Sequence, residues 1–237
     1  MILGIETSTA QGSVAVIESD GEVREVILSE TRNHGRSLAA EVEKLLQGRL
    51  TDIEAFAVSI GPGSFTGLRI GLAFLKGLGI VHERPVVAIS SLKVLAATFS
   101  TGQEASQADW FLPMFDARGK EVYAGLYRGI GASCEVTEEL PDGLYNVQDL
   151  VERLGARPVR ALGDGLAAIL RSSNNREIPD SWMNSFTRGD TEVVQEFPRA
   201  ATLVTLAREE YKRGNTVDLH TLEPKYHQLS AAEKNQK

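Results

Sequence analysis

Short apolar runs separated by polar turns open the chain. The runs cover residues 2–6, 13–17 and 23–28, and each has the length and apolar content typical of a strand. Asp20-Gly21, a strong signal for a two-residue hairpin turn, lies between the second run and the third. This pattern predicts three antiparallel strands that follow one another as a meander.

Helical and strand periods then alternate up to residue 99. The first helical period begins at Asn33 or Ser37 and ends near Gly48. The pattern that follows predicts strand, helix, strand and helix in turn, at residues 53–58, 64–79, 86–89 and 90–99.

The second half of the chain is less regular. The polar, aperiodic stretch 101–107 predicts a domain boundary. Beyond it we expect a hairpin of strands at 110–115 and 121–127, irregular strands within 129–147, a helix at 147–154, a strand at 159–162 and a helix up to Leu170.

The last helical period is bracketed by Pro198 at its start and Gly214 just past its end. We therefore predict a first subdomain of residues 1–104 that is completed by the helix 198–214. A second subdomain covers 105–197, and a polar tail, 215–237, frays.

Three strands, helix, strand, helix, strand, helix is the order of the ribonuclease-H-like unit of actin, hexokinase and Hsp70. The predicted fold is α/β, with two subdomains of mixed sheets that are flanked by helices and face a cleft. In that fold the first hairpin turn approaches a phosphate. Glu6, Thr7, Ser8 and Thr9 are therefore candidates for binding a nucleotide, with Gly163 and Gly165 of a Gly-Asp-Gly turn as the second phosphate loop.

The strongest local signal lies at residues 59–79. Gly61-Pro62-Gly63 forces a turn after a predicted strand, and Ser64 is placed to cap the next helix, whose open N-terminus could receive an anion. The turn is not a Walker A loop, because no lysine follows Gly67. It is not a dinucleotide fingerprint either, because Thr66 stands where the third glycine belongs.

The helix 64–79 is apolar on two faces, although a surface helix needs only one. One explanation is that it is sandwiched inside its own domain. The other is that its glycine-bearing face meets another subunit, because glycine costs a helix about 1 kcal/mol against alanine and lets backbones approach closely. On this hypothesis a subunit interface, shared with the helix at 34–47, contains His34, Leu38, Val42, Gly63, Gly67, Ile70, Gly71, Phe74 and Leu78.

Composition and charge narrow the classes of function. No apolar run approaches the ~20 residues of a membrane span, the first residues lack the features of a signal peptide, and Cys134 is the single cysteine. We therefore expect a cytoplasmic protein.

The net charge of −7, without a basic stripe among aromatic residues, argues against tight RNA binding by this chain alone. The first place to look for RNA contact is the stretch 199–237, with 7 basic and 5 acidic residues.

Two motifs resemble the bacterial TsaB family, formerly YeaZ. They are residues 2–9, ILGIETST, and residues 61–71, GPGSFTGLRIG. Asp116-Ala117-Arg118 with Glu121-Val122-Tyr123 is similar to a hairpin of that family, and Pro224-Lys225-Tyr226 is similar to its tail. The resemblance is dense over the first hundred residues and loose over 129–195.

The resemblance implies a role in making threonylcarbamoyladenosine beside the anticodon of tRNA. Members of the family look like degenerate relatives of the transferase TsaD, bind to it, and work in an assembly with the ATPase TsaE. A non-catalytic subunit that binds and activates a TsaD-type transferase is thus implied, with a homodimer when the chain is alone. It would reach tRNA only through the complex. No cofactor of its own is expected, and ATP or ADP with Mg²⁺ would bind at the interface shared in the complex.

The residues themselves bear on catalysis. The transferase relatives carry a His-x-x-x-His metal pair where this chain reads SLKVL at 91–95, and its four histidines offer no pair at i, i+4. We therefore expect no metal site and no catalytic residue, and we interpret Glu6 as satisfying backbone groups of its turn. The alternative is a nucleotide-cleft ATPase or small-molecule kinase of the same fold. A peptidase is nearly excluded.

Overall fold

A computed structural model describes residues 1–28, 34–100, 110–118, 120–129, 134–154, 157, 159–165 and 197–225, with the backbone alone at 34–36. Contacts divide the chain into two compact units. Of the described residues, unit 1 contains 1–94 and 198–225, and unit 2 contains 95–165 and 197. Each unit has its own sheet and its own hydrophobic core.

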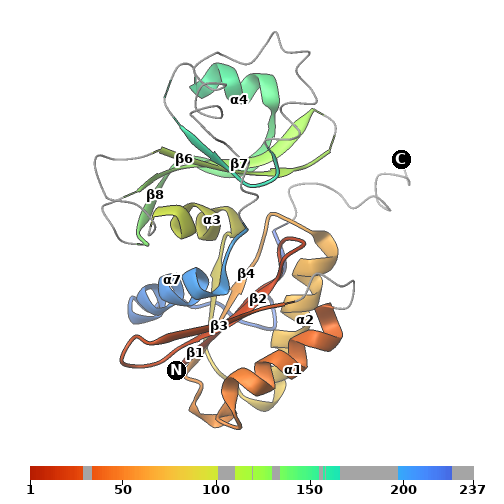
Figure 1. Cartoon of the computed structure of the whole chain (residues 1–237), viewed down its shortest axis with the longest axis vertical. Helices are drawn as coiled ribbons and strands as arrows, with labels where there is room; N and C mark the ends of the chain where they lie inside the picture. The colour runs from red at the N-terminus through yellow and green to blue at the C-terminus, as the bar shows by residue number, and fades with distance from the viewer. Residues whose placement is uncertain are drawn as a thin grey trace. The chain divides into compact units, whose positions relative to one another are not determined.

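Unit 1 is built on a five-stranded mixed sheet with the strand order β3-β2-β1-β4-β5 (Figure 1). β1, β2 and β3 pair antiparallel, as a meander, whereas β4 and β5 join β1 in parallel. The strands span, in chain order, Ile2–Glu6, Ser13–Ile17, Val23–Ile27, Ala55–Ser59 and Val86–Ile89.

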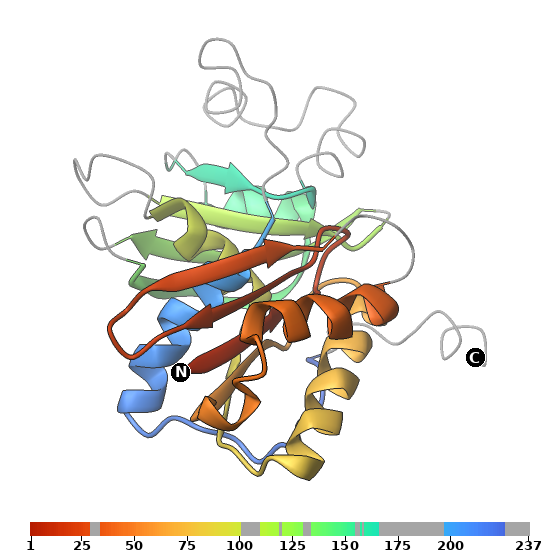
Figure 2. The same cartoon turned by 60° about the horizontal axis from the view of Figure 1, so that its bottom comes forward.

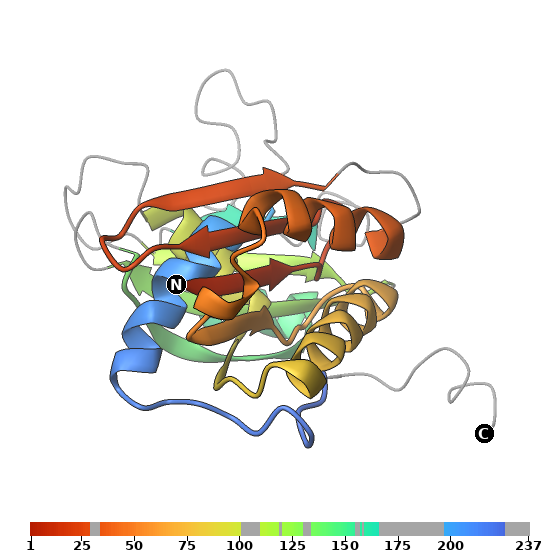
Figure 3. The ribbon, with the colours of Figure 1, turned by 90° about the horizontal axis from the view of Figure 1, so that it is seen from below.

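Two helices cover one face of this sheet, and a third covers the other face (Figures 2 and 3). α1 (His34–Leu46) and α2 (Phe65–Val81) lie side by side and pack on the core of unit 1. α7 (Ala200–Lys212) lies against the opposite face. Short helices connect the strands: η1 (Leu50–Asp52) precedes β4, and α3 (Ser91–Ser100) begins in unit 1 and ends in unit 2.

The close approach of α7 to the sheet depends on a glycine. Gly4 lies in the middle of β1, and a Cβ atom there would overlap the side chain of Val204. The Ala200 N–H donates a hydrogen bond to Ser13 Oγ at 2.8 Å, which fixes the first turn of α7 to β2. α7 thereby contacts all five strands of unit 1.

The segment 215–225 after α7 runs back along unit 1 (Figure 3). The Val217 N–H donates to the Val86 carbonyl at 2.8 Å, which adds an antiparallel bridge at the outer edge of β5. The side chain of Leu219 fills the space over Gly79 of α2 and packs against the core. The prediction of a frayed tail is therefore wrong for this segment, because its apolar residues are held by the edge strand and by α2.

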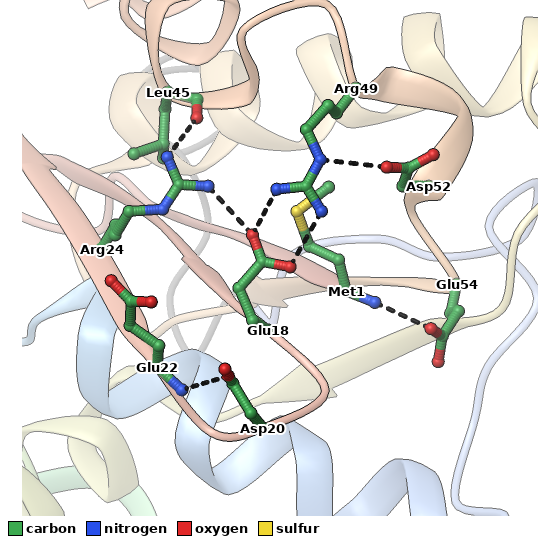
Figure 4. A network of polar contacts seen from close by, with 9 residues as sticks. All are labelled: Met1, Glu18, Asp20, Glu22, Arg24, Leu45, Arg49, Asp52 and Glu54. Atoms are coloured by element: carbon green, nitrogen blue, oxygen red, sulfur yellow. Dashed lines mark hydrogen bonds and ion pairs between the residues drawn. The ribbon is translucent and has the colours of Figure 1, made fainter.

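A polar network ties the β2–β3 hairpin to the end of α1 (Figure 4). Glu18 accepts hydrogen bonds from Arg49 at 2.8 Å and from Arg24 at 3.0 Å. These two donors, Arg49 first, hold the pKa of the Glu18 carboxyl below its ordinary value. Arg24 also donates to the main-chain oxygen of Leu45 at 3.0 Å, in the last turn of α1. The network therefore fixes the end of α1 relative to the sheet.

Unit 2 is built on a four-stranded sheet with the order β8-β7-β6-β9. β6, β7 and β8 pair antiparallel, and β9 lies parallel to β6. The strands β6 to β9 span Trp110–Asp116, Glu121–Gly129, Val136–Asn146 and Arg160–Leu162. α4 (Val147–Leu154) packs its buried residues on one face, where they join Leu112 and Met114 in the second core.

The predicted α/β fold and the ribonuclease-H-like element order of unit 1 are confirmed. Differences lie at the boundaries. The irregular strands expected within 129–147 are the single long strand β8, and the helix expected up to Leu170 lies mostly outside the described residues. The units divide inside α3, ahead of the polar stretch 101–107 that the sequence favoured. Within the described ranges, no helix is long and apolar enough to cross a membrane.

Candidate functional site

The turn that follows β1 packs against the N-terminal half of α2. The Thr7 hydroxyl donates a hydrogen bond to the Gly67 carbonyl at 2.8 Å, and the Ser64 N–H donates to the Ser8 carbonyl at 2.6 Å. Because β1 and β4 are parallel neighbours, the residues that follow the two strands meet at one edge of the sheet. We call residues 6–9 and 59–67 at this edge the β1–α2 junction.

Three glycines allow α2 to approach this turn. A Cβ atom at Gly63 would overlap the carbonyl oxygen of Ser8. Cβ atoms at Gly67 and Gly71 would overlap the carbonyl and hydroxyl oxygens of Thr7. The prediction that these glycines make room for a helix of another subunit is therefore wrong, because residues of the same chain fill that space.

Two N–H groups at the N-terminus of α2 are bonded to oxygens of the chain itself. Ser64 caps the helix as predicted, since its Oγ accepts a hydrogen bond from the Gly67 N–H at 3.2 Å. The Ser64 N–H is itself bonded to the Ser8 carbonyl. The expectation of an open helix N-terminus that receives an anion is not met at these two N–H groups.

The Gly61-Pro62-Gly63 turn is held by two other segments. Gly61 has a φ of +100° and is linked to the start of α3 by two hydrogen bonds. Its N–H donates to Ser91 Oγ at 3.1 Å, and its carbonyl accepts from the Ser91 N–H at 3.0 Å. The Lys225 N–H donates to the Ile60 carbonyl at 2.8 Å. The tail motif that contains Lys225 therefore supports this turn.

Glu6 is fully buried at the end of β1. Its Oε1 accepts a hydrogen bond from the Ser8 N–H at 2.7 Å, and its Oε2 accepts one from the Ser59 hydroxyl. Burial raises the pKa of Glu6 to about 6, although the hydrogen bonds from Ser59 and Ser8 oppose the change. Both carboxylate oxygens are engaged within the chain. Ser59 was not predicted, and the available signal was a serine at the end of an otherwise apolar strand.

The two remaining residues of the turn behave differently. Thr9 donates a hydrogen bond to the Gln11 carbonyl at 3.0 Å. The hydroxyl of Ser8 is buried, and no partner for it is found among the described residues. For Glu6, Thr7, Ser8 and Thr9, nucleotide binding stays a prediction.

Close packing also explains why glycines occupy positions 163 and 165 in the turn of unit 2. Gly163, with a φ of +85°, and Gly165 both lie against β6, where added Cβ atoms would overlap Met114. The Asp116 N–H donates to Asp164 Oδ1 at 3.0 Å, so the turn also fixes the end of β6. A role of Gly163 and Gly165 as a phosphate loop stays a prediction.

On α1, the predicted interface residues point into the core. Leu38 and Val42 are buried in the core of unit 1. They cannot form a surface unless unit 1 rearranges, because they cover the sheet. His34 begins α1, but its side chain lies outside the described residues.

The outer face of α2 is exposed and partly apolar. Ile80 and Val81, at its C-terminal end, are 76% and 74% exposed. A Cβ atom at Gly77 would meet nothing within 4 Å. Three half-buried side chains border this face: Ile70, Phe74 and Leu78. By the outer face of α2 we mean the exposed residues Thr66, Arg69, Ala73, Gly77, Ile80 and Val81.

In the part of the chain that the structure describes, no group of three or more His, Cys, Asp or Glu is arranged to hold a metal ion. Cys134 is a free, partly exposed thiol, and burial raises its pKa. His82 lies at the C-terminal end of α2, and His220 lies in the segment 215–225.

The sequence and the fold match known proteins over nearly the whole chain. The family model described as TsaD, tRNA N6-adenosine threonylcarbamoyltransferase, matches residues 23–236. The tRNA threonylcarbamoyladenosine biosynthesis protein TsaB of Bacillus subtilis is 32% identical, over 98% of this chain and 96% of that protein. The protein of the same name from Escherichia coli is 31% identical, over 95% of this chain and 93% of that protein.

A solved structure from Pseudomonas aeruginosa, of a protein described as similar to the peptidase YeaZ, is 26% identical with a TM-score of 0.77. The match covers 96% of this chain and 99% of that one. The resemblance read from residues 2–9 and 61–71 is thereby confirmed. The chain belongs to the TsaB family of tRNA threonylcarbamoyladenosine biosynthesis proteins, within the larger family that the threonylcarbamoyltransferase model describes.

Proposed function

We propose that the chain is a non-catalytic subunit that binds and activates a TsaD-type transferase. The transferase would threonylcarbamoylate the adenosine next to the anticodon of tRNA. The observation that carries this proposal is the closed β1–α2 junction. Phosphate binding at a helix N-terminus requires free backbone N–H groups, and a hydrated cation requires a free carboxylate. At this junction the Ser64 N–H and both oxygens of Glu6 are bonded within the chain.

The same observation weighs against the alternative of a nucleotide-cleft ATPase or small-molecule kinase. Such an enzyme would have to open the junction by breaking the contact between Ser8 and Ser64. It would also have to separate α2 from Thr7, although Gly67 and Gly71 fit closely around that residue. The accessory subunit requires neither change.

The outer face of α2 supports partner binding. Ile80 and Val81 expose apolar surface, and Gly77 presents bare backbone to solvent. Contiguous exposed apolar surface commonly marks a protein interface, and small residues let a second helix pack near the short end of the usual 8–10 Å. In our proposal this face, with its half-buried neighbours Ile70, Phe74 and Leu78, binds the transferase, or a second copy of the chain when the transferase is absent.

The wider assembly belongs to the same proposal. A TsaE-type ATPase joins the complex in the cytoplasm, and ATP or ADP with Mg²⁺ binds at an interface that the subunits share. The net charge of −7 supports a chain that meets tRNA within the complex rather than alone.

Reconstituted threonylcarbamoyl transfer to a tRNA transcript tests the proposal. The rate with purified TsaD-type transferase and TsaE-type ATPase should rise roughly tenfold or more when the chain is added, which corresponds to an activation barrier lowered by about 1.4 kcal/mol or more. The chain alone should neither transfer the group nor hydrolyse ATP. Turnover by the chain without the transferase would overturn the proposal.

A matched pair of variants tests the interface. Ala73→Glu places a charge on the outer face of α2 and should weaken transferase binding about tenfold or more, as measured by calorimetry. Lys212→Gln, on an exposed position of α7 across the sheet, makes the same change of −1 in net charge and should bind normally. Normal binding by Ala73→Glu would place the interface elsewhere.

A further inference from the structure

Unit 2 carries two arginines on one tryptophan. Trp110 begins β6, and Arg128 lies opposite it in β7. The guanidinium carbon of Arg128 is 5.9 Å from the centroid of the Trp110 ring, and that of Arg157 is 4.4 Å from the same centroid. The Arg157 N–H donates to the Leu154 carbonyl at 3.2 Å, which places Arg157 just beyond α4. We call Trp110, Arg128 and Arg157 the arginine–tryptophan cluster.

The two arginines of the cluster are exposed, and Trp110 is half-buried on the core of unit 2. None of the ion pairs found among the described residues involves Arg128 or Arg157. Unit 1 differs, because five of its arginines lie within 3.6 Å of a carboxylate: Arg24, Arg49, Arg199, Arg208 and Arg213. The positive charge of the cluster is thus directed to solvent.

Other arginines of unit 2 lie over aromatic rings in the same way. Arg153, in the last turn of α4, is 5.8 Å from the centroid of Tyr145. Arg160, in β9, is 5.1 Å from the centroid of Phe99. Of the five arginine–ring contacts found among the described residues, these four lie in unit 2, and the fifth, Arg69 over Phe65 at 3.8 Å, lies in unit 1.

When the flat face of a guanidinium contacts an aromatic ring, the N–H groups at the edge of the guanidinium can still donate hydrogen bonds to an acceptor. Its planar fork matches the two oxygens of a phosphate, and the ring restricts the side chain before binding, so less freedom is lost. Aromatic rings beside cations are also the surfaces on which bases of single-stranded nucleic acid stack. The cluster therefore has the chemistry of a contact with a nucleic-acid backbone.

We propose that the arginine–tryptophan cluster contacts the phosphate backbone of tRNA. The choice of RNA over another polyanion rests on the proposed function. With a net charge of −7, the chain as a whole repels RNA, so contact is restricted to local groups that lack a counter-charge. This favours unit 2 over the described part of the basic stretch 199–237, where Arg199, Arg208 and Arg213 are already paired with carboxylates.

Fluorescence anisotropy of a labelled tRNA transcript with an adenosine beside its anticodon tests this proposal. Binding is measured over a range of salt concentrations, for the chain alone and for its complex with the transferase. The cluster variant Arg128→Gln/Arg157→Gln changes the net charge from −7 to −7 − 2 = −9. The control Arg84→Gln/Arg213→Gln makes the same change at exposed arginines of unit 1 that bind a carbonyl and a carboxylate.

The cluster variant should bind roughly tenfold more weakly or worse, and the slope of log K against log salt should fall by about 1–2, because each phosphate contact contributes about 0.7–0.9. The control should lose less than about threefold in affinity. Equal losses in both variants would mean that net charge alone matters, and wild-type affinity in the cluster variant would mean that the cluster does not touch RNA. Either result overturns the proposal. The proposal is also overturned if the wild type binds tRNA neither alone nor in its complex with the transferase.

Arg128→Lys/Arg157→Lys separates charge from geometry. It should keep the salt slope and lose affinity, because lysine has the charge without the planar fork. If Arg128→Gln/Arg157→Gln melts at a much lower temperature than the wild type, the lysine variant replaces it as the test of the cluster. Full wild-type affinity of the lysine variant for tRNA would show that the stacked geometry of the arginines does not contribute to binding. Stimulation of the transferase by the wild-type chain is measured in parallel. A chain that binds the transferase without stimulating it overturns the proposed function, while anisotropy with that complex still tests the cluster.

Discussion

The two faces of α2 use glycine for opposite purposes. On the inner face, Gly67 and Gly71 allow the helix to lie directly on Thr7, with no room for a methyl group. On the outer face, Gly77 meets nothing within 4 Å. The residue type and the helix are the same, so the difference lies entirely in what approaches each position. A glycine stripe therefore marks a close contact only where a partner atom is found.

Alanine substitutions on the two faces should differ most. Gly67→Ala places a Cβ atom on the carbonyl oxygen of Thr7, which belongs to the main chain and cannot rotate away, so the free energy of unfolding should fall by about 2–4 kcal/mol. Gly77→Ala should raise it by up to about 1 kcal/mol, because alanine favours the helix. Urea denaturation of both variants measures the contrast. Equal effects would show that the inner face is looser than the structure indicates.

The buried carboxyl of Glu6 provides a second test of the packing at the β1–α2 junction, where the inner face of α2 lies. The pKa of Glu6 is raised from 4.5 to about 6, so the folded state holds the proton more tightly than the unfolded state. The resulting stability is fully present below about pH 4.5 and is lost as the pH rises through about 6. At 1.36 kcal/mol per pH unit the change is about 2 kcal/mol.

Urea denaturation from pH 4.5 to 7.5 tests this value in the wild type and in Glu6→Gln. Other carboxyl groups act on both proteins alike, so the difference between the two isolates Glu6. This difference should change by about 2 kcal/mol over the range, in favour of the wild type at low pH. A constant difference would mean that Glu6 ionises in the folded chain as it does in the unfolded one.

Substitutions on the outer face of α2 should change the self-association of the chain and not the stability of the monomer. Ile80→Asp changes a side chain that is 76% exposed, so the unfolding free energy of the monomer should stay within about 0.5 kcal/mol. Self-association, measured by sedimentation, should weaken about tenfold or more. Val23→Asp, on the edge strand β3, is the control for a new charge at an exposed apolar residue. A dimer that is unaffected by Ile80→Asp but lost in Val23→Asp would move the interface to the sheet edge.

The sequence was sufficient for the elements of unit 1, because its apolar periods are regular and its turns carry Asp-Gly and Gly-Pro-Gly signals. It was not sufficient for the contacts of those elements. Thr7 and Gly67 are 60 residues apart, and their contact exists only once β1 and β4 pair. Similarly, Trp110 and Arg128 meet through strand register, which the apolar pattern of β7 does not specify.

The segment 215–225 shows another limit of composition. It is mostly polar, which favoured a frayed tail, but Val217 and Leu219 are held by the β5 edge and by Gly79 of α2. Leu219 and Leu222 pack against the core of unit 1, and backbone hydrogen bonds from Val217 and Lys225 hold the segment on either side of them. The packing of this segment depends on the shape of the folded surface of unit 1, and the pattern of polar and apolar residues within the segment does not predict that shape.

The discontinuity of unit 1 has a consequence during synthesis on the ribosome. The sheet face that carries Gly4 is covered by α7, and α7 emerges only after the described residues of unit 2 have been made. The described strands of unit 2 all precede α7 in the chain, so they are available for pairing while unit 1 still lacks a layer. The strands β1 to β5 thus wait for residues 198–225 before their sheet is enclosed. A pause in that interval prolongs, and a premature stop makes permanent, the exposure of one hydrophobic face of the sheet, and exposed surface of this kind makes a chain prone to aggregation.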